Sequence, residues 1–237
     1  MYYFYMEKEY FVLYTPNDMN KAYNLMEKDY TSFEIFDVLS GDDDIEKQVC
    51  LIKLEKLSSE EDANKLISVL TGQHGPVREI CSAKINQFLK NKEYQNYFQG
   101  EHIREICLNA LNDIIPTVAR NILEVISLLP DKKLVCDTLL DRILYLREYE
   151  DNEELLSNHE IVKKTFKLYW YLEALCEFSD IIQENEKIND VIKFVYNHED
   201  YTIREKVAKL LSKMIGFEEY KQILKNDENP YVFSFLK

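Results

Sequence analysis

The chain has few of the residues that make tight turns. It contains five glycines and five prolines among 237 residues, about a third of the usual share of these two residues. β-Sandwiches and β-barrels need glycine or proline at most of their turns, so this shortage argues against both folds. Apolar residues make up 46% of the chain and aromatic residues 13%. That content is enough to bury a core and argues against a disordered chain.

Positive charge is also scarce. The chain has 29 Lys and Arg against 43 Asp and Glu, which gives a net charge of −14. Residues 1–60 carry −7, residues 61–120 carry 0, residues 121–180 carry −6 and residues 181–237 carry −1. Proteins that bind nucleic acid neutralise its phosphates with Lys and Arg. Proteins that bind anionic membrane surfaces also need these basic residues. We therefore expect no nucleic-acid partner and no membrane contact.

The cysteines lack the spacing of a disulfide framework or of a zinc site. The five lie between 26 and 40 residues apart, with no Cys-x-x-Cys pair, and most have apolar neighbours in the sequence. We expect all five to be reduced and packed as small apolar residues, which suits a cytoplasmic protein. They are Cys50, Cys81, Cys107, Cys136 and Cys176. We also expect no signal peptide and no membrane span, because neither pattern is present.

The usual catalytic and metal-binding motifs are missing as well. The two His-Glu pairs, at residues 159–160 and 198–199, lack the second histidine that a zinc protease has three residues after the glutamate. The acidic run at residues 42–44 lacks the glycine and the closing glutamate of a calcium loop. The glycines are too scattered for a phosphate-binding loop. We therefore predict no cofactor, no metal and no catalytic residue.

What the chain does have is the periodicity of α-helices along most of its length. One face of the segment 76–91 collects its apolar residues, Val77, Ile80, Cys81, Ile85, Phe88 and Leu89. Similar patterns predict helices over residues 118–129, 160–178 and 203–215. The segment 160–178 is apolar around most of its circumference, so we expect it to be the best-buried helix. The pattern predicts an all-α fold of roughly twelve helices in antiparallel pairs.

One arrangement recurs along the chain. An apolar helix end runs into a short polar turn, and a branched apolar residue then opens the next helix. The opening residues are Ile45, Val77, Val118, Ile203 and Val232. The long interval between residues 118 and 203 leaves room for one degenerate unit near Ile161.

These units resemble HEAT repeats, in which two antiparallel helices form a unit and the second helix opens with a Pro/Asp-x-Val-Arg-like sequence. The match rests on Pro76-Val77-Arg78, Ile203-Arg204 and Asn229-Pro230-Tyr231-Val232. The resemblance implies an armadillo-like α-α superhelix, a solenoid, over residues 33–237 in five or six units. An irregular acidic insertion falls at about residues 145–160. The chain departs from the family pattern at Ala119 and Phe233, which replace the arginine, and at Glu46, which inverts its charge.

The first residues differ in composition from the rest. Seven of the first 15 are aromatic, namely Tyr2, Tyr3, Phe4, Tyr5, Tyr10, Phe11 and Tyr14. We predict that residues 1–32 form a segment that caps the open end of the solenoid. A short strand over the first residues is the alternative.

Arg78 and Arg204 take equivalent places in two units, which makes them the candidate binding residues. In HEAT arrays such an arginine often pairs with an acidic or amide residue of a neighbouring turn and forms a ladder. The alternative is that both point into the concave groove and meet an acidic partner. We expect the polar faces of the second helices to line that groove, with Arg78, Ser82, Asn86, Asn121, Glu124, Arg204 and Lys213. A weak basic stripe of Lys206, Lys209 and Lys213 is expected to be a solvated face.

The resemblance implies a function in binding, because solenoids present extended surfaces to partners. We expect a non-enzymatic scaffold or adaptor whose partner is a protein or peptide. The alternative is a HEAT-like enzyme, either a DNA glycosylase of the alkylpurine type or a lyase for a pigment or another small ligand. The low positive charge disfavours the glycosylase.

Overall fold

The computed structural model describes residues 14–148 and 158–236. Within these two ranges every regular element is a helix and no strand occurs, which confirms the predicted all-α class. The described part contains more helices than the roughly twelve expected, because α6, α11 and α15 are short segments of four residues each. The predictions for the first 13 residues and for most of the insertion at 145–160 lie outside the described residues.

The helices are arranged in two rows. The first row contains α3 (Asp44–Lys53), α5 (Gly75–Lys90), α8 (Pro116–Leu128), α10 (Asn158–Leu175) and α13 (Tyr201–Lys213), each in contact with the next. The second row contains α2 (Ser32–Leu39), α4 (Glu60–Ser68), α7 (Glu101–Ala110), α9 (Lys132–Glu148) and α12 (Ile188–Val195). Each helix of the second row packs against the helix of the first row that follows it in the chain. Short turns join the partners in four of these pairs, α2–α3, α4–α5, α7–α8 and α12–α13, and make them fold back on one another.

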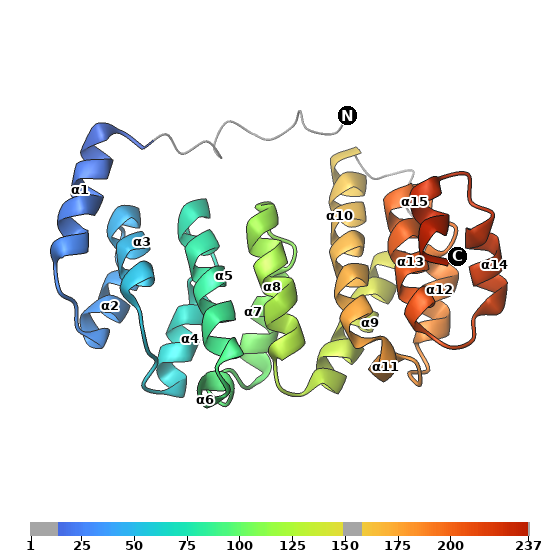
Figure 1. Ribbon diagram of the computed structural model, residues 1–237, viewed down its shortest axis with the longest axis horizontal. Coiled ribbons are helices and arrows are strands. Elements are labelled where there is room, and N and C mark those ends of the chain that lie inside the picture. Colours follow the sequence, from blue (N-terminus) through green and yellow to red (C-terminus); the bar gives the residue numbers. More distant parts are fainter. Residues whose placement is uncertain (1–13, 149–157, 237) are drawn as a thin grey trace.

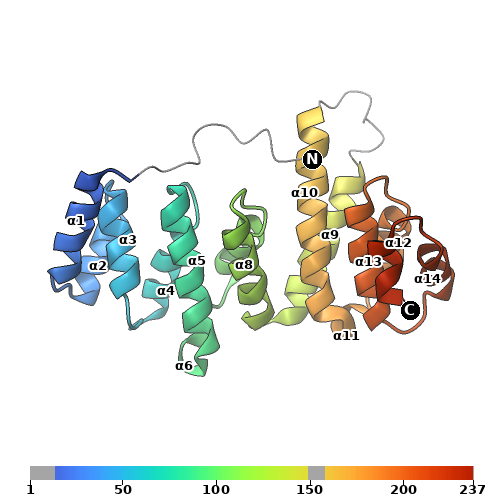
Figure 2. The ribbon, with the colours of Figure 1, turned by 45° about the horizontal axis from the view of Figure 1, so that its top comes forward.

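Short helices complete the rows and close their ends. At one end α1 (Pro16–Glu27) packs against α3, and at the other end α13 is covered by α14 (Glu218–Lys225), α15 (Pro230–Phe233) and the 3-10 helix η4 (Ser234–Leu236). The remaining elements are α6 (Lys92–Gln95), the 3-10 helix η3 (Cys176–Phe178) and α11 (Ser179–Ile182). Figure 1 shows the row along the longest axis of the molecule, from α1 in blue to α14 in red, and the turned view in Figure 2 keeps the same order.

The helix starts follow from local sequence. The side chain of Thr15 accepts a hydrogen bond from the backbone of Asp18, whose carboxylate in turn accepts one from the backbone of Thr15, and Thr31 forms the same reciprocal cap with Glu34. Such capping boxes satisfy backbone N–H groups that the first turn leaves without partners. Proline stands in the first turn of α1, α5, α8 and α15, where its missing N–H costs nothing.

The core runs between the two rows as a continuous cluster of buried apolar side chains. Val77, Cys81 and Ile85 of α5 are fully buried, which confirms the face assigned from the sequence. The four predicted helices all form, with ends shifted by one to three residues. The prediction that the segment 160–178 is the best buried holds only for its second half. Ile161 and Val162 are exposed, because α10 extends beyond the neighbouring helices of its row (Figure 2).

All five cysteines lie in the described ranges, where they are free and buried, as the sequence predicted. Removal from water disfavours the thiolate. Burial raises the pKa of Cys50 to about 11 and that of Cys107 to about 12. These thiols therefore pack as apolar groups rather than as nucleophiles.

Candidate functional site

Arg78, in the first turn of α5, joins two neighbouring turns of the chain. Its Nε donates to Oδ2 of Asp113 at 2.6 Å and its Nη2 donates to Oδ1 at 3.0 Å. Its Nη1 donates to the backbone carbonyl of Gln73. Asp113 belongs to the α7–α8 turn and Gln73 to the α4–α5 turn. The side chains of Arg78 and Asp113 are 15% and 7% exposed, so the paired guanidinium is largely shielded from water.

Arg204 does the same in α13. Its Nε donates to Oδ2 of Asp227 at 2.6 Å and its Nη2 donates to Oδ1 at 3.1 Å. Its Nη1 donates to the carbonyls of His198 and Glu199 in the α12–α13 turn, at 2.8 and 2.9 Å. Asp227 lies in the α14–α15 turn. The Arg204 guanidinium lowers the pKa of the Asp227 carboxyl, because a charged donor stabilises the ionised acid.

The two sites are therefore built alike. In each, the arginine bonds the turn that precedes its own helix and a carboxylate in the turn that precedes a neighbouring helix. Both arginines therefore pair with an acidic residue of a neighbouring turn, which is the ladder-type contact that the resemblance implied. Whether Arg78 and Arg204 also contact a partner stays a prediction.

Two residues of these sites were not singled out in the sequence, the acceptors Asp113 and Asp227. Each stands three residues before the proline that opens the next helix, Pro116 or Pro230. Each also accepts a hydrogen bond from the backbone N–H two residues later, at 2.9 Å in both cases. The repeated Asp-x-x-Pro spacing is the signal that could have identified them.

The polar face of α5 is used to hold α8. Asn121 donates to Oγ of Ser82 at 2.9 Å, and Asn86 donates to Oε2 of Glu124 at 2.7 Å. Ser82 is 0% exposed and Asn86 7%. The expectation that these two side chains are available to a partner is therefore wrong. The first-row helices pack side by side, so the polar residues that flank the apolar face of α5 point towards α8. Ala83 and Gln87, farther from α8, are exposed.

A second polar junction joins α10 to α13. Nζ of Lys209 donates to Oε1 of Glu173 at 2.6 Å, and Nζ of Lys206 lies 3.1 Å from Oε2. Lys206 is buried, with its ammonium 4.6 Å from the centre of the Tyr169 ring. Burial tends to raise the pKa of Glu173, but the two lysines outweigh it and lower that pKa. The expectation of a solvated stripe is therefore wrong for Lys206.

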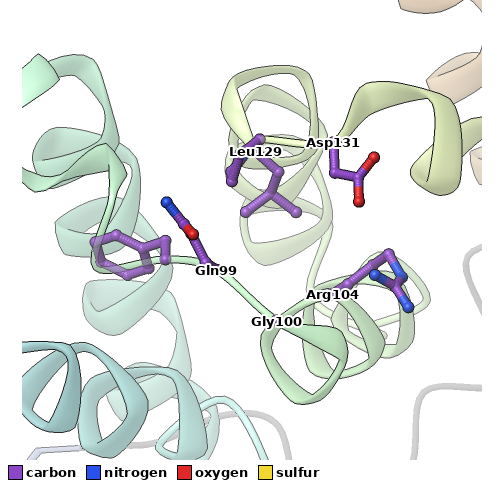
Figure 3. Close-up of a pocket in the computed structure, with 7 residues that line it drawn as sticks. Gln99, Gly100, Arg104, Leu129 and Asp131 are labelled. Atoms are coloured by element: carbon purple, nitrogen blue, oxygen red, sulfur yellow. The ribbon is translucent and has the colours of Figure 1, made fainter.

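A small hollow of about 140 Å³ lies where α7 begins, beside the α8–α9 turn. Nε of Arg104 is buried there without a hydrogen-bond partner. Figure 3 shows Arg104 and Asp131 on one side of the hollow and Gln99 on the other. Asp131 has a φ of 61°, a left-handed conformation that is uncommon for a residue other than glycine. No pattern in the sequence predicted this hollow.

Among residues 14–148 and 158–236, no three His, Cys, Asp or Glu side chains come close enough together to hold a metal ion. No helix in these ranges has the length and apolar character needed to cross a membrane.

In comparisons with family models, with curated proteins and with solved structures, nothing matches the chain.

Proposed function

We propose that the chain is a HEAT-like α-α superhelix that serves as a non-enzymatic scaffold for a protein or peptide partner. The observation that supports this most directly is the repeated arginine–aspartate linkage at Arg78 and Arg204. Equivalent contacts at equivalent positions are what a chain of similar stacked units produces. The paired rows of helices fit such a stack.

In this proposal the partner binds the outward face of the first row. The side chains between neighbouring helices are held by contacts such as Asn86 to Glu124, so the exposed positions beside them sit on a fixed backbone. Ala83 and Gln87 on α5 and Arg120 on α8 are exposed. They belong to residues 61–120, which carry no net charge between two acidic blocks. A partner with basic ends would therefore meet favourable charge on both sides.

Arg78 and Arg204 remain the proposed contributors to partner binding, at the edges of this surface. Their guanidinium groups already bond carboxylates. Each would thus act mainly by fixing the turn that borders the surface.

Photo-crosslinking in the native cells tests the proposal. A photoreactive amino acid replaces Gln87 or Arg120, which are exposed on the first row, and Asn109 of α7, exposed on the second row, is the control. We expect the same crosslinked protein from positions 87 and 120 and not from position 109. Equal crosslinking from all three positions would contradict a dedicated surface. Retention of a DNA duplex at low salt would favour the glycosylase alternative.

A further inference from the structure

Two exposed tyrosines stack on each other where α15 packs against α13. Tyr201 and Tyr231 are 41% and 66% exposed. Their ring centroids are 6.4 Å apart and their ring planes differ by 28°, within the range of stacked aromatic pairs. Tyr201 is the first residue of α13, and Tyr231 lies in the first turn of α15. They form one exposed aromatic surface across the contact between these helices (Figure 1), which we call the tyrosine pair.

The backbone beneath the tyrosine pair is fixed on both sides. Oδ1 of Asp200 and Oδ1 of Asn229 each accept a hydrogen bond from the backbone N–H two residues later, at 2.8 and 3.0 Å. In the same helix turns, Ile203 and Val232 are fully buried in the core. The two rings therefore stand on a rigid support, and a rigid surface loses little conformational freedom when a partner binds.

The surroundings of the tyrosine pair are acidic. Asp200 and Glu228 stand one and three residues before its two tyrosines. The hydrogen bond to Asp227 and the charges of Asp227, Glu228 and Asp200 raise the pKa of Arg204, so these three carboxylates lie around one guanidinium. They leave a net charge of −2 beside the rings. The start of a helix carries only about half a positive charge, which the carboxylates outweigh.

We propose that the tyrosine pair binds an arginine side chain of the partner, with the guanidinium lying flat on an exposed ring face. A cation is attracted to the face of an aromatic ring, and the planar guanidinium also stacks on it. No lysine or arginine of residues 14–148 and 158–236 lies over either ring. The position is therefore open to a cation from another molecule, and the nearby carboxylates attract one.

An arginine of a peptide or protein is a better occupant than a second copy of the chain. A stable dimer needs about 800 Å² of contact on each partner. Two tyrosines supply less than that, because aromatic residues bury only about 150–250 Å² each. Two copies with a charge of −14 each also repel one another. The proposal rests on the proposed function in binding a protein or peptide, and it specifies the chemistry of one contact.

A titration followed by NMR tests this contact with a defined probe. The probe is a capped peptide of sequence Gly-Arg-Gly-Arg-Gly, and its counterpart has citrulline in place of both arginines. Citrulline keeps the planar end of the side chain and removes its charge. We expect the arginine peptide to shift the backbone amide signals of Tyr201 and Tyr231 saturably, and less so at high salt. The citrulline peptide should bind much more weakly.

Substitutions then assign the contact to the ring. Tyr231→Leu should lower the affinity for the arginine peptide about two- to fivefold, whereas Tyr231→Phe, which keeps the ring, should leave it unchanged. Tyr231 is two-thirds exposed, so both variants keep the core intact, and circular dichroism verifies their fold. Tyr23→Leu is the matched control. Tyr23 is 74% exposed on α1, at the opposite end of the row, and its loss should have no effect.

Three outcomes would overturn the proposal. Equal binding of the citrulline peptide would show that the rings make an apolar contact without selecting a cation. Unshifted signals of Tyr201 and Tyr231, or an affinity unchanged by Tyr231→Leu, would place the peptide elsewhere. A loss on Tyr231→Phe as large as on Tyr231→Leu would assign the contact to the hydroxyl group. The titration needs no native partner, so its failure removes the arginine contact alone. Equal crosslinking from positions 87, 120 and 109 would instead contradict the scaffold.

Discussion

Asp227 is the residue through which the contribution of an arginine–aspartate pair to stability can be tested most directly. Replacing it by Asn removes the charge that faces the largely buried guanidinium of Arg204. Losing a charge-assisted pair of this kind costs about 1.5–3 kcal/mol, so Asp227→Asn should lower Tm by several degrees. Asp29→Asn, at an exposed position between α1 and α2, is the matched control and should leave Tm unchanged. Equal melting of the two variants would show that the pair does not stabilise the fold.

The same variant makes a pH prediction. The pKa of Asp227 is lowered in the folded chain by the hydrogen bonds from Arg204. A lowered carboxyl pKa stabilises the fold at pH values above the unfolded pKa of about 3.9. This stabilisation is lost as the pH falls through the folded pKa. The difference in Tm between the native chain and Asp227→Asn should therefore be constant near neutral pH and shrink below about pH 4. A difference that grew on acidification would contradict this origin.

At the scale of the element, one carboxylate of α10 pairs with two lysines of α13. Glu173 faces both Lys206 and Lys209. Glu173→Gln leaves the buried ammonium of Lys206 without that charge, and breaking a buried pair from one side is strongly destabilising. We expect Tm to fall by several degrees in calorimetry. Glu184→Gln, at an exposed position of the neighbouring turn, should have no effect.

A second substitution separates charge from packing at this junction. Adding Lys206→Met to Glu173→Gln removes the ammonium, whose remaining carboxylate partner is Glu205 at 3.5 Å, and keeps an apolar stem of similar length. We expect the double variant to recover most of the lost Tm, since replacing both partners of a buried pair is often neutral. A double variant less stable than Glu173→Gln would show that Lys206 stabilises the fold through other contacts, such as its position over Tyr169.

The elements could be predicted from the sequence, but the roles of their polar residues could not. Apolar periodicity marks the side of a helix that meets the core, and this located α5, α8, α10 and α13 within three residues. Periodicity does not separate a polar residue that faces the next helix from one that faces water. Ser82 and Gln87 both count as polar on α5, yet the first is buried and the second exposed. That difference depends on how α8 packs against α5, which is a tertiary property.

At the scale of the whole molecule, contacts join neighbouring helices of the two rows. Each helix of the two rows is stabilised by its contacts with the buried apolar cluster and by its interfaces with neighbouring helices. Helices in the middle of the row are supported from both sides, whereas the ends are supported from one. α5 and α8 are held by core contacts and by the Arg78 and Asn86 hydrogen bonds. α1 has no buried residue and α14 has one, Leu224.

Amide hydrogen exchange followed by mass spectrometry should therefore show a gradient along the row. We expect peptides from α5 and α8 to exchange most slowly, and peptides from α1 and α14 to exchange first, because local opening needs the fewest contacts to break at the ends. Asp113→Asn removes the carboxylate that links the α7–α8 turn to Arg78. It should speed exchange in α5 and α8 much more than in α12 and α13, which lie beyond α10. Uniform protection across the chain, or a uniform response to Asp113→Asn, would mean that the molecule opens as a single cooperative unit. The arginine–aspartate pairs would then contribute to the whole core rather than to the interfaces between adjacent helical pairs.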